Sequence, residues 1–359
     1  MEKQVSCGCG GRAAVAARET AERPPFVSGF VTAGDASIPV VSTRLTRADV
    51  VGGWRVRWDI GRMRYTVRPG LYAVGAPGAE SPVLVSANYK LSFDSLRREL
   101  SGIDAWILVL DTKGINVWCA AGKGTFGTRE LTERIAAVHL DRVVSHRTLI
   151  LPQLGAPGVS APQVKEASGF RVKYGPVRAS DIRAFLAAGQ KKDDEMRRVR
   201  FRFADRMKIA PAEVSHSWPV VLAVLGASVL LALPFAAGYP ARLLRFLVPL
   251  LGAVLMGTVV FPALLPVLPF RAFSLKGATL GVLWAVAAAL VMGSSVPTAL
   301  ALVLIVAPVV AFISMAFTGS STFTCQPGAA LEVRWGVVPM IASLVLGLGL
   351  ATTTRVVGI

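Results

Sequence analysis

The sequence predicts an α/β domain of the doubly wound, Rossmann-like kind, followed by an all-α transmembrane domain of about five helices. Between residues 80 and 190, apolar segments of strand length alternate with amphipathic segments of helix length, a pattern typical of a parallel sheet covered by helices on both faces. After Trp218 charged residues almost disappear, since only six of the 39 Lys and Arg residues and one of the 22 Asp and Glu residues follow it. Apolar runs long enough to cross a bilayer fill this second part.

These patterns divide the chain into four segments. We expect a flexible N-terminal tail at 1–44, because Gly, Ala and Pro are prominent there. The α/β domain covers 45–190, a charged helical stalk covers 191–218, and the transmembrane domain covers 219–359. The first twenty residues contain no apolar core of a signal peptide, so the α/β domain is expected in a reducing cytoplasm.

The elements of the α/β domain are predicted in order from their hydrophobic periodicity. A hairpin is expected at 54–58 and 63–67, turning at Ile60–Gly61. Further strands are expected at 82–86, 105–111, 149–151 and 170–174, and helices at 93–100, 128–138, 160–167 and 180–188. Ligands of such sheets bind outside the carboxyl ends of the strands, and the segment after Asp111 leaves one of these ends.

The apolar part predicts a multi-pass protein of the inner (cytoplasmic) membrane. Spans are expected at 219–238, 244–264, 277–293, 297–317 and 336–352. The strongly basic first part is expected to stay in the cytoplasm. The absence of charge at the centre of every span argues against an ion- or proton-coupled transporter. The net charge of +17 is ascribed to the membrane flank rather than to nucleic acid, because no nucleic-acid motif accompanies it.

The segment that begins at Asn116 carries the clearest chemical signal. Asn116 is a good helix N-cap, which places Cys119 at about the third helical position. Backbone amides and the helix dipole at that position favour a thiolate. Trp118 supplies an apolar wall, and three small residues follow the cysteine: Ala120, Ala121 and Gly122. These residues favour a reactive or ligating sulfur beside a large flat partner, and the alternative is a buried structural cysteine.

Other candidate sites carry weaker signals. Cys7, Cys9 and Cys325 have no disulfide or zinc spacing; Cys7 and Cys9 could bind a soft metal, and Cys325 could relay one, or all three are spectators. Residues 122–127 read G-x-G-x-x-G, with Asp141 as a ribose ligand, but a dinucleotide fingerprint should follow its strand directly. The Asp-x-His-x-x-Gly signature of histidine-ligated cobalamin proteins is absent.

The octapeptide Asn116–Lys123 (Asn-Val-Trp-Cys-Ala-Ala-Gly-Lys) resembles the cap-helix motif of the HgcA family of mercury-methylating corrinoid proteins. The similarity continues through 151–158 and 174–178. It indicates the corrinoid-binding domain that this family shares with the large subunit of the corrinoid iron–sulfur protein, over roughly residues 45–190. The family also has about five C-terminal spans. The soluble iron–sulfur relative holds a four-cysteine cluster, which Cys7 and Cys9 alone could not form.

The resemblance implies that Cys119 is the catalytic residue and the lower axial ligand of a corrinoid cobalt. Cofactor-binding residues would be those of the cap helix: Asn116, Val117, Trp118, Cys119, Ala120, Ala121, Gly122 and Lys123. Four residues at predicted strand ends are weaker candidates for holding the corrinoid: Asn88, Leu154, Gly155 and Gly175.

The implied reaction is corrinoid-dependent transfer of a methyl group from cobalt to Hg(II), which gives methylmercury. Hg(II) is an electrophile and accepts a methyl carbanion or radical, which a thiolate ligand on the metal should favour. Two electrons must then return the cobalt to Co(I), which implies a ferredoxin-like [4Fe–4S] partner, HgcB, whose cysteines could also carry mercury. The methyl donor is implied to be a folate-pathway methyltransferase. Two alternatives are a membrane-anchored corrinoid methyl carrier of one-carbon (acetyl-CoA pathway) metabolism and a membrane protein whose cytoplasmic domain only senses a ligand.

Overall fold

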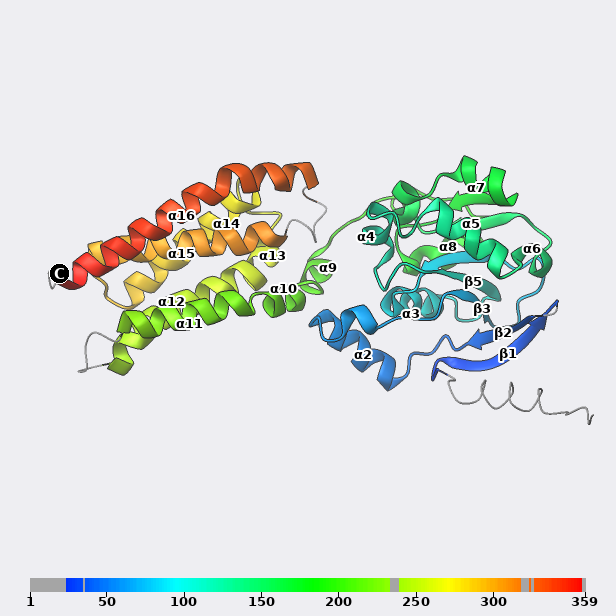
Figure 1. Ribbon diagram of the computed structural model, residues 1–359, viewed down its shortest axis with the longest axis horizontal. Helices are drawn as coiled ribbons and strands as arrows, with labels where there is room; N and C mark the ends of the chain where they lie inside the picture. The colour runs from blue at the N-terminus through cyan, green and yellow to red at the C-terminus, as the bar shows by residue number, and fades with distance from the viewer. Residues whose placement is uncertain (1–23, 35, 233–238, 318–322, 324–325, 357–359) are drawn as a thin grey trace, which may run out of the picture. The chain divides into compact units, whose positions relative to one another are not determined.

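The computed structural model describes residues 24–34, 36–232, 239–317, 323 and 326–356. The chain forms two compact units. One contains the described residues up to Val56 together with Gly61–Arg198, and the other contains Arg57–Ile60 and the described residues from Val199 onward. The first unit holds a β-sheet with helices, and the second is helical (Figure 1). The prediction of an α/β domain followed by an all-α domain is therefore confirmed. Cys7, Cys9 and Cys325 lie outside the described residues.

The first unit is built on a seven-stranded mixed sheet in the order β1-β2-β3-β5-β4-β6-β7. The strands are β1 (Val27–Ala33), β2 (Ala36–Val41), β3 (Gly70–Val74), β4 (Val83–Ala87), β5 (Ala105–Leu110), β6 (Thr148–Leu151) and β7 (Arg171–Tyr174). The β4–β5, β4–β6 and β6–β7 pairs are parallel, as predicted. β3 is antiparallel to β5, and β1 is antiparallel to β2. The doubly wound parallel arrangement is therefore limited to the half of the sheet formed by β5, β4, β6 and β7.

Helices cover both faces of that parallel half (Figure 1). They are α3 (Lys90–Glu99), α4 (Val117–Gly122), α5 (Thr128–Ala137), α6 (Leu140–Val143), α7 (Ala161–Ser168) and α8 (Ile182–Ala187). Val83 and Val85 pack in one core with α4, α5 and α7, whereas Leu84 packs in another with α3 and α8. Since successive strand residues point to opposite faces, fully apolar strands bury both faces at once.

The predicted hairpin at 54–58 and 63–67 is wrong. Residues 47–57 form helix α2 (Arg47–Arg57), and a single 3₁₀ turn, η1 (Arg62–Arg64), follows it. The side chains of Thr46 and Asp49 fix the start of α2, because Thr46 N donates to Asp49 Oδ2 at 2.9 Å and Asp49 N donates to Thr46 Oγ1 at 3.2 Å. This capping box overrides the two-residue alternation around Trp54.

Two further predictions about irregular segments are corrected. β1 and β2 lie inside the segment predicted to be a flexible tail. β1 pairs with β2, and β2 pairs with β3, so this part of the tail is ordered by the sheet. The stalk at 191–218 is not one continuous helix, because helices form only at α9 (Phe203–Met207), α10 (Ala210–His216) and the start of α11. Before them the chain is held in a non-helical path by contacts such as that of Val177 N, which donates to Met196 O at 2.9 Å.

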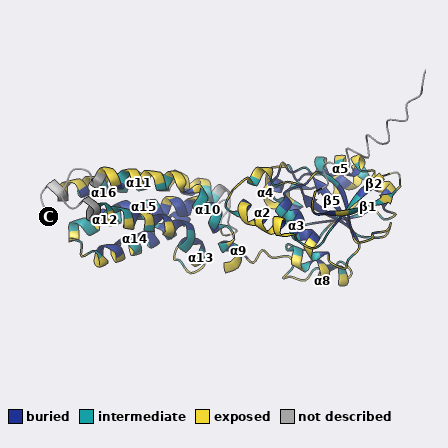
Figure 2. Cartoon of the chain, turned by 90° about the horizontal axis from the view of Figure 1, so that it is seen from below, coloured by how far each residue is buried: buried dark blue, intermediate teal, exposed yellow. Residues whose placement is uncertain are grey.

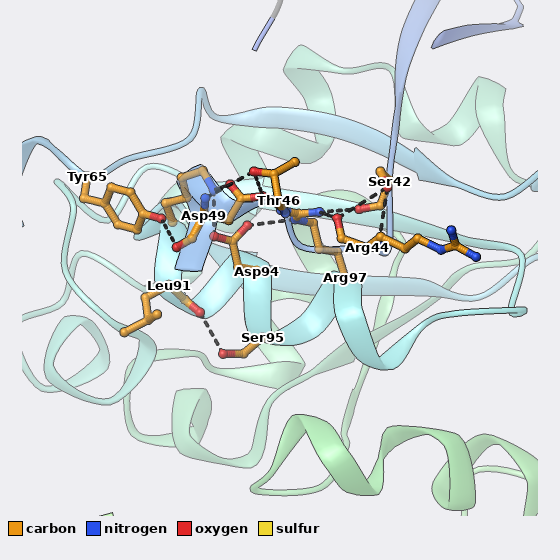
Figure 3. A network of polar contacts seen from close by, with 10 residues as sticks. Ser42, Arg44, Thr46, Asp49, Tyr65, Leu91, Asp94, Ser95 and Arg97 are labelled. Carbon is orange, nitrogen blue, oxygen red and sulfur yellow. Dashed lines mark hydrogen bonds and ion pairs between the residues drawn. The ribbon is translucent and has the colours of Figure 1, made fainter. Parts of the chain in front are cut away.

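A buried ion network joins α2 to α3 (Figure 3). The Arg97 guanidinium, which is fully buried, donates to Asp49 Oδ2 at 2.8 Å and to Asp94 Oδ1 at 2.7 Å. Lys90 Nζ donates to the other oxygens of the same two carboxylates, at 2.5 and 2.6 Å. Arg97 Nη1 also donates to the carbonyl of Arg44, 3.1 Å away, just before α2. The two carboxylates are therefore fully compensated, and α2 is fixed on α3.

This network predicts acid sensitivity of the α/β unit. Burial alone would raise the pKa of Asp49, but hydrogen bonds from Lys90 and Thr46 outweigh it and hold the pKa well below its ordinary value. A depressed carboxyl pKa adds stability above about pH 4, the unfolded value, and this stability is lost as the pH falls further. We expect the urea midpoint of the wild type to drop between pH 5 and pH 3 by more than that of Asp49→Asn. Equal drops would contradict the assignment.

The helical unit contains helices of membrane-spanning length. Among the described residues, four helices are long and apolar enough to cross a membrane, or five if the bent pair 203–216 and 218–230 is one span. The helices after α10 are α11 (Trp218–Ala232), α12 (Tyr239–Leu255), the π-helical η4 (Met256–Val260), α13 (Phe261–Leu264), α14 (Phe273–Val291), α15 (Val296–Ala316) and α16 (Gln326–Val356). The expected number of about five spans agrees with this count.

Charged side chains in this unit satisfy helix ends. Glu332 on α16 accepts hydrogen bonds from the backbone N–H groups of Phe273 and Ser274, both at 3.0 Å, at the start of α14. Lys276 Nζ donates to the carbonyl of Leu265 at 2.7 Å. These are the terminal groups that a helix leaves without partners. Small residues let the helices approach closely, since a Cβ at Gly281 of α14 would lie 2.6 Å from Cα of Ala307 on α15.

Candidate functional site

An open apolar pocket of about 420 Å³ lies at the carboxyl ends of β4, β6 and β7. Its floor includes Ile150 and Leu151 at the end of β6, and α3 and α4 contribute its sides. The α4 residues are Asn116, Val117 and Trp118, where Asn116 is the residue before the helix. This is the edge where a doubly wound sheet binds its ligands, and the volume is within the roughly 300–1,000 Å³ of small-molecule sites.

The turn between β5 and α4 is organised by Asn88. Its side-chain oxygen accepts hydrogen bonds from Thr112 N at 3.1 Å, Thr112 Oγ1 at 2.8 Å and Gly114 N at 3.0 Å. Its amide nitrogen donates to Asp111 Oδ1 at 3.2 Å. Gly114 has φ +73°, a left-handed conformation that favours glycine. Asn88 is buried and uses its polar atoms within this turn, so it sets the position from which α4 starts.

Helix α4 presents Cys119 to solvent. The side chain of Asn116 accepts a hydrogen bond from Cys119 N at 2.9 Å, so the predicted N-cap is confirmed. Cys119 is exposed, so the alternative prediction, a buried structural cysteine, is wrong. Trp118 is 41% exposed, an unusual position for a large apolar ring. The outer surface of α4 therefore offers a thiol next to an indole, beside the pocket that Trp118 helps to line.

The inner surface of α4 packs closely against the core through small residues. Ala120 and Ala121 are buried in the core cluster of the sheet. A Cβ at Gly158, in the 3₁₀ segment η2 (Gln153–Gly158), would lie 3.0 Å from Cα of Ala121. One at Gly155 would lie 2.5 Å from the ring of Phe126. Close backbone contact between η2 and α4 therefore holds the cap helix in place from behind.

The predicted cofactor-binding residues occupy three environments. Five line the pocket: Asn116, Val117, Trp118, Leu154 and Gly175. Three lie exposed on or beyond the outer side of α4: Cys119, Gly122 and Lys123. The remaining four are buried, and their visible contacts support the local structure: Asn88, Ala120, Ala121 and Gly155. Contact with a cofactor stays a prediction for all twelve residues.

Apart from Gly175, the pocket residues of α3 and of the chain after β7 were not predicted from the sequence. Tyr89, Ser92 and Ser95 line it from the β4–α3 connection and from α3, and Arg178 lines it after β7. Ser95 is already engaged, since its hydroxyl donates to the carbonyl of Leu91 at 2.8 Å (Figure 3). Tyr89 and Ser92 follow a predicted strand end, which is the signal that could have identified them.

The G-x-G-x-x-G alternative does not have the geometry of a dinucleotide site. Gly122 ends α4 and Gly127 directly precedes α5, so the motif connects two helices rather than a strand and a helix. Phe126, in the middle of the motif, is fully buried. The histidine nearest to the sheet is also used structurally, because His146 Nδ1 accepts a hydrogen bond from Thr148 N at 3.2 Å.

Replacing Asn116 with alanine should loosen the cap helix. The hydrogen bond to Cys119 N disappears, and loss of such a cap costs about 1 kcal/mol. We expect faster amide hydrogen exchange in residues 117–122 and little change in the unfolding midpoint of the α/β unit. Asn116→Asp, which keeps an accepting oxygen, is the matched control and should retain slow exchange. Equal exchange in both variants would show that the cap does not hold α4.

Comparison with known proteins finds similarity in the pocket-bearing part of the chain. Residues 61–186 match the family model described as CO dehydrogenase/acetyl-CoA synthase delta subunit. The acetyl-CoA decarbonylase/synthase complex subunit gamma of Archaeoglobus fulgidus is 32% identical over 122 residues, which are 33% of this chain and 26% of that subunit. That of Methanopyrus kandleri is 34% identical over 122 residues, with the same shares covered.

A bacterial relative shows the same similarity. The corrinoid/iron–sulfur protein large subunit of Moorella thermoacetica is 32% identical over 124 residues, which are 34% of this chain and 27% of that protein. The chain thus spans about a quarter of the length of these curated relatives. α2 and the helices long enough to cross a membrane lie outside the matched residues. Residues 61–186, which include the pocket and α4, are thus similar to this family model, and about a third of the chain is similar to a part of the corrinoid/iron–sulfur protein large subunit and of the acetyl-CoA decarbonylase/synthase gamma subunits.

Proposed function

We propose that this protein is a membrane-anchored, corrinoid-dependent methyltransferase whose cofactor would bind at α4, where the Cys119 thiolate would hold the cobalt. The observation that carries the proposal is an exposed thiol on a capped helix, directly beside an apolar pocket at the ligand-binding edge of the sheet. Similarity to the corrinoid/iron–sulfur protein large subunit supports the choice of cofactor.

The residues present suit a corrinoid. A corrin is a broad, largely apolar ring with polar substituents at its rim, and the pocket is apolar with serine, asparagine and arginine side chains among its lining residues. When bound, the corrinoid supplies a cobalt ion that can carry a methyl group from a donor to an acceptor. Cys119 would hold the metal, Trp118 would keep water from the sulfur, and Asn116 would fix the direction in which α4 presents both.

The acceptor that we propose is Hg(II), so that the product is methylmercury. Support comes from the octapeptide that surrounds Cys119 and from the membrane-spanning helices, two features of the resemblance to the HgcA family. A thiolate ligand increases the electron density on its metal and so favours delivery of a methyl group to an electrophile. A methyl group that leaves with its bonding electron pair takes two electrons from the carrier metal. A reductant would have to restore them before the carrier could accept another methyl group.

A second candidate has its own support. The relatives found by comparison are named as parts of the acetyl-CoA decarbonylase/synthase complex or as the corrinoid/iron–sulfur protein. These names favour a second function, that of a membrane-anchored methyl carrier in the acetyl-CoA pathway. The two candidates share the cofactor and differ only in the acceptor of the methyl group.

The partners follow from the chemistry. For transfer to Hg(II), a ferredoxin-like [4Fe–4S] protein such as HgcB would return the electrons, and its cysteines could deliver mercury. A folate-pathway methyltransferase would supply the methyl group. The basic α/β unit would stay on the cytoplasmic side of the inner membrane, where these partners occur.

A competition between acceptors tests the proposal. The full chain, purified from a corrinoid-producing host in detergent, is assayed for cobalt, supplied with a methyl donor, and mixed with Hg(II) or with an acetyl-CoA synthase under reducing conditions. Methylmercury formed in stoichiometric amounts supports the proposed acceptor. Transfer to the synthase alone would favour the pathway carrier. Protein that contains no cobalt and takes up no added corrinoid would contradict both.

A further inference from the structure

Helix α2 carries an apolar surface that faces away from the protein. Val50, Val51 and Trp54 are 59%, 56% and 60% exposed, and Figure 2 shows α2 largely in yellow. At about 100° per residue these three side chains share one side of the helix. Asp49, Gly53 and Val56 are buried on the opposite side, against α3 and its neighbours. A Cβ at Gly53 would lie 3.3 Å from the side chain of Leu91 on α3, so the inner side is closely packed.

Arginines frame this apolar surface. Arg47 precedes it by one turn and Arg55 follows Trp54, both exposed, and the acidic residue of α2, Asp49, is buried in the ion network. The outer side of α2 thus combines a tryptophan, two valines and positive charge with no exposed carboxylate. We call Arg47, Val50, Val51, Trp54 and Arg55 the α2 face. Basic, apolar helix surfaces with tryptophan bind in the interfacial region of anionic bilayers.

We propose that the α2 face docks onto the surface of the membrane and contacts anionic lipid headgroups. Trp54 and the two valines would enter the boundary between headgroups and acyl chains, while the arginines reach the lipid phosphates. The inference rests on the membrane location proposed above and not on the corrinoid chemistry.

The chain that follows α2 supports a lipid partner over a protein partner. Asp59 and the carbonyl of Trp58 are held by α10: Ser215 Oγ donates to Trp58 O at 2.8 Å, and His216 Nε2 lies 3.0 Å from Asp59 Oδ2. α11, which begins at Trp218, is the apolar half of the bent candidate span. The segment directly after α2 is therefore hydrogen-bonded to the helix that leads into the first strongly apolar helix.

Photocrosslinking from within the α2 face tests the proposal. The full chain with Val51→p-benzoylphenylalanine is reconstituted into phosphatidylcholine vesicles with or without phosphatidylglycerol, irradiated, and analysed for lipid adducts by mass spectrometry. Phe30→p-benzoylphenylalanine is the matched control, because Phe30 is an apolar residue of β1 that is 52% exposed. We expect lipid adducts at position 51 and few at position 30. Combining the probe with Arg47→Glu should lower the yield by about five-fold in anionic vesicles.

The outcomes distinguish docking on lipid from recognition of anionic headgroups. Equal lipid adducts at positions 51 and 30, or adducts at position 51 only with protein, would overturn docking of the α2 face on lipid. Equal yields with and without phosphatidylglycerol would overturn the recognition of anionic headgroups. Flotation of the chain with the vesicles is measured in the same samples. A chain that does not float would overturn the membrane location together with this proposal.

Discussion

Cys119→Ala is expected to abolish methyl transfer and to change the visible spectrum of the bound cofactor, while the protein stays folded. The side chain is exposed, and surface substitutions of this kind change stability by about 0.5 kcal/mol or less. Loss of a partner that only orients a metal ligand costs roughly 10–100-fold, so loss of the ligand itself should cost at least about 100-fold. Product formation and the absorption spectrum are measured on the same preparation.

Two further variants make this result specific. Cys119→Ser preserves the size of the side chain but not the thiolate, and it should lose activity as alanine does. Glu133→Ala, an exposed change on α5 outside the pocket, should leave the activity unchanged. Full activity with an unaltered spectrum in Cys119→Ala would exclude cobalt ligation by this residue. Loss of activity with an unaltered spectrum would leave Cys119 a role in the reaction but not as the cobalt ligand.

Arg97→Met should destabilise the α/β unit by about 3–5 kcal/mol, because it leaves two buried carboxylates with incomplete partners. The methionine fills part of the space but donates no hydrogen bond to Asp49 or Asp94. Lys90 then remains as the cation of the network, and the carbonyls before α2 lose their donor as well. The measurement is urea-induced unfolding of the detergent-solubilised chain, followed by the circular dichroism of the sheet-containing unit.

The neighbouring residue provides the control. Arg98→Met removes the same charge from the same helix, but Arg98 is exposed and pairs only with Glu99, a surface pair worth less than about 1 kcal/mol. A similar shift of the unfolding midpoint in both variants would show that the buried network contributes no more than a surface ion pair.

The elements that could be predicted from the sequence are those that depend on local signals. β5 is an uninterrupted apolar run and β4 is apolar except for Ser86, and Asn116 lies three residues before Cys119, so the sequence predicts both strands and the cap. α2 was missed because its apolar residues face outward, and the alternation around Trp54 imitates a strand. The capping pair Thr46 and Asp49 was the local evidence for a helix.

The candidate site was only partly predictable, for a related reason. Trp118 and Cys119 belong to one short motif, whereas Tyr89 and Arg178 reach the same pocket from elements far apart in the chain. Their convergence depends on the strand order, in which β4 lies between β5 and β6. Asn88 lies at the strand end that the sequence indicates, and its side chain holds the turn before α4, a role that no local pattern predicts.

The exposure of Cys119 also bears on how the protein must be made. An accessible thiol near a helix N-terminus is open to oxidation to a sulfenic acid or to a disulfide with a second thiol. Chains that have not yet received their cofactor are exposed to this damage, and a corrinoid seated on α4 would cover the sulfur. Assembly therefore competes with oxidation, and a cell would need to load the cofactor under reducing, oxygen-poor conditions to obtain active protein.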